Sequence, residues 1–138
     1  MSRFVIDASI VLSWCFPDEN SSAAQEVAES FKQGDTGLAT GFWPHEVLNA
    51  LLVGAKRKRI STSLVKSFLD DLVLLPIELA SSNAEDVFTR IQSLSLRHNL
   101  TAYDAAYLDL AIENHVALAT LDESLARAAK VEKVKLFA

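Results

Sequence analysis

Short apolar runs alternate along this chain with longer segments whose apolar positions recur at helical spacing. The run from Arg3 to Ile6 predicts a short buried strand. Further strands are predicted at 38–40, 74–79, 116–120 and 134–137, and Pro76, which has no N–H group, places the segment 74–79 at a sheet edge. Strands that alternate with helices predict an α/β fold with a central parallel sheet flanked by helices on both faces.

Residues that favour helix starts precede the amphipathic segments. Asn20, Ser21 and Ser22 are cap candidates for a helix at 23–32, and Pro44 suits the first position of a helix that runs to about residue 57. Other helices are predicted at 9–16, 61–72, 83–96, 101–114 and 123–130, the first of them ended by a proline at position 17. No repeat or linker interrupts the pattern, which predicts one domain over residues 1–138.

Four acidic residues lie where a predicted strand meets a helix or in an early helical turn: Asp7, Glu46, Asp104 and Asp122. Sites in open α/β folds form outside the carboxyl ends of the strands, so these acids can meet in one pocket. Like charges in one pocket require cations or bound protons. All-oxygen ligation suits hard cations, which predicts a site for Mg²⁺ or Mn²⁺.

Each acid also has a plain structural interpretation. Asp7 and Asp122 are typical helix caps, and Glu46 in a first helical turn is favoured by the helix dipole. Asp104 is the more telling residue, because small and apolar side chains surround it on its predicted helix and a charge there needs a partner. Asp109 and Glu113 fall on another face of that helix and are expected to be solvated.

Composition narrows the function further. The net charge of −5 argues against general coating of nucleic acid, and half of the residues are hydrophobic, which suggests an additional buried surface such as a subunit interface. A lone cysteine, Cys15, cannot form an internal disulfide and fits a reducing cytoplasm, where it serves as a small apolar filler. No signal peptide is visible, and no run approaches the roughly 20 apolar residues of a membrane span.

The basic run of the chain and its histidines and aromatics have less specific interpretations. Lys56, Arg57, Lys58 and Arg59 form the basic run, which indicates either charges that complement a helix end or contacts with RNA phosphates. The three histidines are expected to be structural or exposed: His45, His98 and His115. Trp14 and Phe16 are expected to pack in the core or in a partner groove, with base stacking as the alternative, and Phe42 and Trp43 are expected in the core.

Several segments together carry a family resemblance. They are Asp7-Ala8-Ser9, Trp43-Pro44-His45-Glu46, Tyr103-Asp104-Ala105-Ala106-Tyr107 and Ala119-Thr120-Leu121-Asp122. In this order and at this spacing they resemble the PIN-domain ribonucleases, and among these the VapC toxins of toxin–antitoxin modules. The resemblance implies a metal-dependent endoribonuclease, usually a homodimer, that a small antitoxin protein holds inactive. It also implies that the four acids form the active site, with Ser9 as the hydroxyl residue that accompanies the first aspartate.

The resemblance implies a place for the antitoxin as well. Helices 23–32 and 61–72 flank the acidic pocket in the family arrangement. Four apolar residues of these helices are expected to line a groove between them: Val27, Phe31, Leu64 and Phe68. An antitoxin helix in that groove would bring an arginine to Asp7 or Asp104, because a guanidinium pairs with carboxylates in a bidentate way.

Three alternative functions remain open at this point. A phosphotransfer or receiver domain would use Asp7 as its acceptor, but a dehalogenase-like site needs an aspartate where Ser9 stands, and a receiver needs a better placed lysine than Lys130 or Lys133. A PIN-like module without catalysis would keep the fold and lose its acids, whereas all four are present. A nuclease of the same type with a DNA substrate is the third.

Overall fold

A four-stranded parallel sheet forms the centre of the protein. The computed structural model describes residues 2–19 and 21–137, and its sheet has the order β3-β2-β1-β4. The strands are β1 (Arg3–Ile6), β2 (Thr36–Thr40), β3 (Ile77–Ala80) and β4 (Ala117–Ala119), and every pairing between them is parallel. The predicted α/β fold is therefore confirmed, and β3 lies at the edge at which Pro76 places it.

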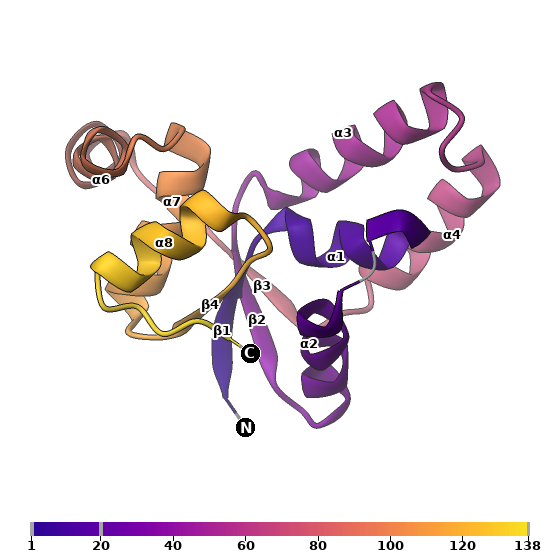
Figure 1. Ribbon diagram of the computed structural model, residues 1–138, viewed down its shortest axis with the longest axis horizontal. Coiled ribbons are helices and arrows are strands. Elements are labelled where there is room, and N and C mark those ends of the chain that lie inside the picture. The colour runs from indigo at the N-terminus through magenta and orange to yellow at the C-terminus, as the bar shows by residue number, and fades with distance from the viewer. Residues whose placement is uncertain (1, 20, 138) are drawn as a thin grey trace.

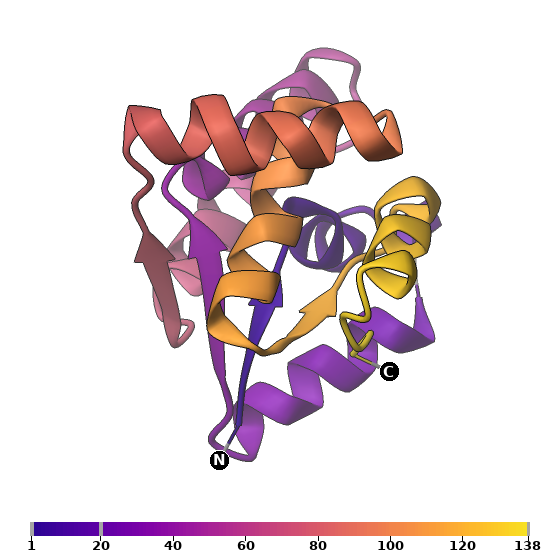
Figure 2. The ribbon, with the colours of Figure 1, turned by 90° about the vertical axis from the view of Figure 1, so that its left-hand side faces the viewer.

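Helices cover both faces of this sheet (Figure 1). One side carries α1 (Ala8–Cys15), α2 (Ser22–Lys32), α3 (Trp43–Lys56) and α4 (Thr62–Leu72), and a 3₁₀ turn, η1 (Pro17–Glu19), follows α1. The other side carries α6 (Gln92–His98), α7 (Ala102–Asn114) and α8 (Glu123–Val131). Figure 2 shows that the helical segment 84–98 crosses the end of the sheet toward which the strand arrows point.

Side-chain caps start most of these helices, as the sequence predicts. Ser21, Ser61 and Thr101 accept hydrogen bonds from backbone N–H groups in the first turns of α2, α4 and α7. Asn83 does the same for the short helix α5 (Ala84–Asp86). Asn20, the other proposed cap, lies outside the described residues. Because a cap and its donor are neighbours in sequence, these helix starts are local properties of the chain.

Several predicted boundaries were wrong. β2 begins at Thr36 because that residue pairs with Arg3. β3 begins only after Pro76, since the N–H groups of Leu74 and Leu75 close turns back onto the end of α4. The segment 134–137 is not a strand, although Leu136 forms one isolated parallel bridge with Leu118.

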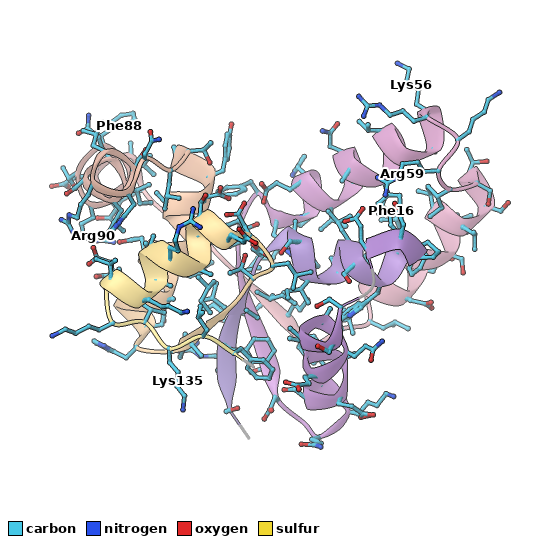
Figure 3. The ribbon with its side chains drawn as sticks, in the orientation of Figure 1. Phe16, Lys56, Arg59, Phe88, Arg90 and Lys135 are labelled. Carbon is cyan, nitrogen blue, oxygen red and sulfur yellow. The ribbon has the colours of Figure 1, made fainter. Side chains whose placement is uncertain are left out.

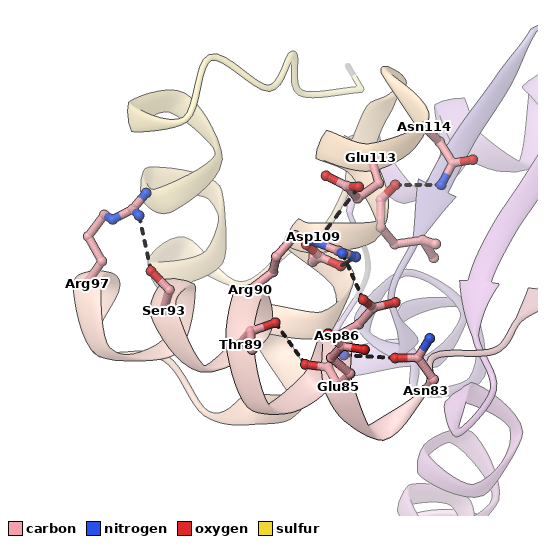
Figure 4. Close-up of polar contacts among 11 residues, drawn as sticks. Asn83, Glu85, Asp86, Thr89, Arg90, Ser93, Arg97, Asp109, Glu113 and Asn114 are labelled. Atoms are coloured by element: carbon pink, nitrogen blue, oxygen red, sulfur yellow. Dashed lines mark hydrogen bonds and ion pairs between the residues drawn. The ribbon is translucent and has the colours of Figure 1, made fainter.

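The predicted helix 83–96 is interrupted. α5 and α6 are joined by a π-helical turn, η2 (Val87–Ile91). Such turns in an α-helix are frequent near functional sites. Arg90 of this turn forms a two-point ion pair with Asp109 of α7, at 3.1 Å for both contacts, and it also reaches Asp86 at 2.9 Å (Figure 4). The expectation that Asp109 is solvated was wrong, because it is 6% exposed and its charge is neutralised by Arg90; Glu113 is exposed as expected.

Residues from the strands and from both helical layers build the hydrophobic core. Phe4 of β1 packs its ring against Phe31 of α2 with the ring centroids 5.5 Å apart. Val27 of the same helix is fully buried, so Val27 and Phe31 contribute to the core and do not line a groove with α4. The expected groove was therefore wrong on its α2 side, because the apolar face of α2 is already covered by the sheet and by α1.

Four other residues are placed much as the sequence predicts. Cys15 is 3% exposed, and burial raises the pKa of its thiol to about 12, so it behaves as a small apolar side chain. His98 is bonded to the carboxylate of Glu132 at 2.6 Å, whereas His45 and His115 are exposed. None of these histidines lies in an ion-pair or hydrogen-bond contact with the four candidate acids.

Three of the four aromatics expected inside the protein are buried or anchored there. Phe16 and Trp43 are 2% and 7% exposed, and the indole N–H of Trp14 donates to the carbonyl of Ala24. Phe42 is half-buried and packs its ring against two tyrosines of α7. Among the helices described at 2–19 and 21–137, none is long and apolar enough to cross a membrane.

Gly54 provides a test of how tightly α1 and α3 pack. A Cβ atom at this position would lie 2.6 Å from the ring of the buried Phe16. Alanine normally stabilises a helix by about 1 kcal/mol relative to glycine, but overpacking costs about 1–3 kcal/mol. We expect Gly54→Ala to lower the free energy of unfolding by about 1 kcal/mol in urea titrations. Adding Phe16→Leu should relieve that clash, so the double variant should lose less than the sum of the two single losses.

Candidate active site

The first candidate acid, Asp7, lies where β1 passes into α1. Its side chain caps α1: one oxygen accepts the N–H of Ser9 at 3.0 Å and also the Ser9 hydroxyl. The other oxygen accepts the hydroxyl of Thr120, which directly follows β4. Asp7 is 5% exposed, so a carboxylate with three donors is buried between the ends of two neighbouring strands.

Ser9 and Thr120 join the loop after β4 to the loop after β1. The Ser9 hydroxyl accepts the N–H of Leu121 at 2.9 Å, and the Thr120 hydroxyl accepts the N–H of Asp122 at 3.0 Å. Asp122 in turn caps α8 by accepting the N–H of Leu125 at 2.8 Å. Thr120 was missed in the sequence analysis, and its only signal there was a hydroxyl residue two positions before a candidate acid.

Glu46 lies near the junction between β2 and α3. It lies in the first turn of α3 and is half-buried, and one of its carboxylate oxygens accepts the hydroxyl of Tyr107. Tyr107 belongs to α7 and is 1% exposed. Burial and the bond to Glu46 raise the pKa of this phenol, so it stays a hydrogen-bond donor. Tyr107 was also missed, although it lies one helical turn after Asp104 and therefore on the same side of α7.

The pKa values of these acids show that their charges act on one another. Burial raises the pKa of Asp7 to about 6 against the lowering effect of the hydrogen bonds from Ser9 and Thr120, and the charge of Asp104 makes a smaller contribution to this rise. Burial also raises the pKa of Glu46, again with a contribution from Asp104. The pKa of Asp104 is raised by burial and then by the charge of Asp122. Asp104, on the first turn of α7, is thus the carboxylate that interacts with the other three.

The described part of the chain offers no positive charge to these acids. The ion pairs among the described residues are formed by carboxylates other than the four candidate acids. Within residues 2–19 and 21–137, no group of three or more Asp, Glu, His or Cys side chains is already arranged to hold a metal ion. Mg²⁺ usually keeps several waters and binds through one or two carboxylates, so an uncompensated all-oxygen set of this kind suits it.

The basic run lies at the other end of α3. Lys56 is the last residue of that helix and its side chain points away from the molecule, while Phe16 and Arg59 lie side by side below it (Figure 3). Arg59 is engaged: its guanidinium contacts Asp18 at 3.0 Å and Glu19 at 2.8 Å, and it lies 4.3 Å from the centroid of the Phe16 ring. Lys56, Arg57 and Lys58 are exposed.

A four-stranded parallel sheet with helices on both faces is an open α/β domain, in which sites form outside the carboxyl ends of the strands. The family model for the PIN domain matches residues 4–131. This chain belongs to the PIN-domain family. It is 30% identical over 125 residues to Ribonuclease VapC3 of Pyrobaculum aerophilum, an alignment that covers 90% of this chain and 92% of that relative.

Solved structures share the fold at lower identity. The crystal structure of PAE2754 from Pyrobaculum aerophilum superimposes with a TM-score of 0.71 at 18% identity, over 92% of this chain and 79% of that one. VapBC2 from Rickettsia felis, bound to a DNA fragment from its promoter, gives a TM-score of 0.66 at 13% identity, over 99% of this chain and 97% of that one. At these identities the two structures support the fold alone.

The buried charge of Asp7 predicts a pH dependence of stability. Its pKa rises from 3.8 to about 6 on folding, so the folded protein binds this proton more tightly than the unfolded chain does. Ionisation of Asp7 therefore lowers the free energy of unfolding between about pH 4 and pH 6, by about 3 kcal/mol in total. Asp7→Asn removes this dependence. Relative to wild type, the variant should become more stable as the pH rises from 4 to 7.

Urea titrations in EDTA at several pH values measure that difference. Glu123→Gln is the matched control, since the Glu123 side chain is 92% exposed and should show no such trend. A stability difference between Asp7→Asn and wild type that stays constant over this pH range would contradict the assignment of a buried, proton-binding Asp7.

Proposed function

We propose that this protein is an endoribonuclease that depends on Mg²⁺ or Mn²⁺ and acts as the toxin of a toxin–antitoxin pair. The observation that carries the proposal is the placement of acids at the strand–helix junctions: Asp7 after β1, Glu46 in the first turn of α3 and Asp122 before α8, with Asp104 in the first turn of α7. The charge of Asp104 adds to the raised pKa of both Asp7 and Glu46. The likeness to a relative named as a ribonuclease over nine-tenths of the chain supports RNA as the substrate.

The proposed division of roles follows from the contacts of each acid. Asp7 and Asp104 hold the cation, with Asp7 fixed in place by Ser9 and Thr120. Glu46 keeps one oxygen on the Tyr107 hydroxyl and offers the other to a water molecule. A bound divalent cation would supply charge stabilisation at the phosphate and a more acidic water. Asp122 adds negative charge beside Asp104 and orders the loop after β4 through its cap.

Proton transfer is assigned to Glu46. Its pKa is raised by burial, which brings this carboxylate nearer to the operating pH that favours a general base. The phosphotransfer alternative is disfavoured because Ser9 stands where a dehalogenase-like site needs a second aspartate, and its hydroxyl donates to Asp7. The exposed Lys56, Arg57 and Lys58 remain candidates for RNA contacts, and Arg59 is withdrawn from that role by its ion pairs.

The partner surface proposed here differs from the one first expected. A cavity of about 280 Å³ lies between α3 and α4, lined by Leu52, Val65 and Leu69 among others. Leu52 and Leu64 are about half-exposed on these helices. An amphipathic helix of an antitoxin fits such a surface, with an arginine extended to the acids. The likeness in fold to the VapBC2 complex supports this kind of partner.

A homodimer is also part of the proposal. Five large apolar side chains on β3, the turn before it and the helical segment 84–98 are more than two-fifths exposed: Val73, Leu74, Leu79, Phe88 and Leu96. A second copy of the chain would bury them. We also propose that the protein acts in the reducing cytoplasm, which fits its single, free cysteine, the buried Cys15.

Loss of a single acid should abolish cleavage. Asp104→Asn removes the carboxylate that interacts with the other three and keeps nearly the same volume, so RNA cleavage in Mn²⁺ should fall at least about 100-fold while the fold persists. Asp7→Asn should lose RNA cleavage to a similar extent and also keep the fold. EDTA should stop the wild-type reaction, and added Mn²⁺ should restore it. Glu123→Gln, next to Asp122 but fully exposed, should cleave normally. If purified Asp104→Asn cleaves RNA at a rate near that of wild type, the assignment of the active site is wrong.

The antitoxin proposal has its own test. Co-expression with the protein encoded by the neighbouring reading frame should yield a tight complex without ribonuclease activity. Replacing the arginine of that partner which reaches the acids should restore cleavage, because the guanidinium then no longer pairs with Asp7 or Asp104. Leu52→Asp in this chain should weaken the complex and leave the isolated enzyme active. If the neighbour protein neither binds nor inhibits this chain, the antitoxin proposal is wrong, but the ribonuclease proposal is unaffected.

A further inference from the structure

A cavity of about 410 Å³ with an uncharged lining lies against the first turns of α7, the helix that carries Asp104. Its wall includes Tyr103, the residue that precedes Asp104 in α7, together with Phe42 at the start of α3 and the two serines that follow β3, Ser81 and Ser82. The residues described around it include no charged side chain. An uncharged cavity on the helix that carries Asp104 is a chemical environment separate from the acids, suited to a ligand group that carries no charge itself.

Two aromatic rings define the shape of this cavity, here called the Tyr103 pocket. The rings of Phe42 and Tyr103 lie 5.1 Å apart at 80°, so they present one face and one edge at a right angle. Phe42 is braced from behind by the buried Tyr107, 5.5 Å away at 79°. Tyr103 is 60% exposed, which leaves much of its ring available to a ligand.

The rest of the wall adds small and polar groups. Ala102 and Ala106, one turn apart on α7, leave room because their side chains end at Cβ. Ser81 and Ser82 are exposed, and their hydroxyls can each donate and accept a hydrogen bond. A flat group with polar edges satisfies both features, since it can stack on an aromatic ring and bond to hydroxyls at its rim.

We propose that the Tyr103 pocket binds one unpaired nucleobase of the RNA next to the bond that is cleaved. The inference rests on the proposed ribonuclease function and adds a subsite to it. Proteins read single-stranded RNA by stacking splayed-out bases on aromatic rings and bonding to their edges. Phe42 of the pocket wall packs on Tyr107, and the Tyr107 hydroxyl donates to Glu46, so the pocket and the acids are separated by one side chain. The ribose and phosphate attached to a base in the pocket can therefore reach the acids. A base is uncharged, so the nearby carboxylates do not repel it.

The experiment uses a single-stranded RNA with a mapped cleavage site and a series of analogues, each lacking one base. With wild-type protein in Mn²⁺, one abasic position beside the cleaved bond should lower kcat/KM roughly tenfold, the size expected for loss of one base–aromatic stack. Tyr103→Leu should lower kcat/KM on the intact RNA by a similar factor. At that same abasic position Tyr103→Leu should show no further loss, because both changes remove one shared contact.

Two variants serve as controls. Tyr103→Phe keeps the ring and should rescue most of the kcat/KM that Tyr103→Leu loses, because the stacking surface is retained. Val131→Ala shortens a side chain at the end of α8 that is 68% exposed and does not line the pocket. It should leave the abasic profile unchanged. Equal melting temperatures for Tyr103→Leu and wild type establish that the variant is folded.

The other outcomes are separable. If wild type cleaves normally but the losses from Tyr103→Leu and from every abasic position simply multiply, the pocket does not bind a base, and the nuclease proposal survives. If Tyr103→Leu cleaves all RNAs like wild type and only loses binding to the neighbour protein, the pocket belongs to a protein partner and the inference is overturned. If wild type and Asp104→Asn both fail to cleave any RNA, the proposed function falls and the base subsite falls with it.

Discussion

The burial of the Asp7 carboxylate is the constraint on which the rest of this structure depends. A charge at 5% exposure is costly, and here it lies between the carboxyl ends of β1 and β4. The two hydroxyls that meet it, from Ser9 and Thr120, also accept backbone N–H groups of the loop after β4. The same few bonds therefore satisfy the charge, start α1 and fix the approach to α8. A change at this point would affect two helices and two strand ends at once.

α7 connects that centre to the remainder of the site. Its first turns carry Tyr103, Asp104 and Tyr107, which reach the neutral cavity, the acids and Glu46 respectively. Further along, Asp109 is held by Arg90 from the π-helical turn. Because that turn inserts one extra residue into the helical repeat, it alters which side of the segment 84–98 Arg90 faces. The middle of α7 is thus held by two polar contacts, from Tyr107 to Glu46 and from Arg90 to Asp109.

The sequence predicted the features that depend on neighbouring residues and missed those that depend on distant ones. The caps at Ser21, Ser61, Asn83 and Thr101 were correct, since each bonds within its own first turn. The Arg90–Asp109 pair joins residues nineteen positions apart, and Thr120 meets Asp7 across 113 positions, so no local pattern reveals either contact. The groove proposed from Val27 failed for a related reason: an apolar helix face looks the same in sequence whether the sheet or a partner covers it. The roles of the four acids remain predictions.

The close approach at Gly54 has a consequence for the spacing of charges along this protein. Phe16 fills the place where a side chain at Gly54 would project, and the guanidinium of Arg59 covers the ring from its other side. The far end of α3 is thereby anchored to the end of α1, the helix that Asp7 caps at its start. Ten residues of helix separate Glu46 from Lys56, a length on the order of 15 Å. With both ends of α3 anchored, the acids and the exposed cations are held a fixed distance apart. Any polyanion that touches both must adopt a conformation that spans this distance.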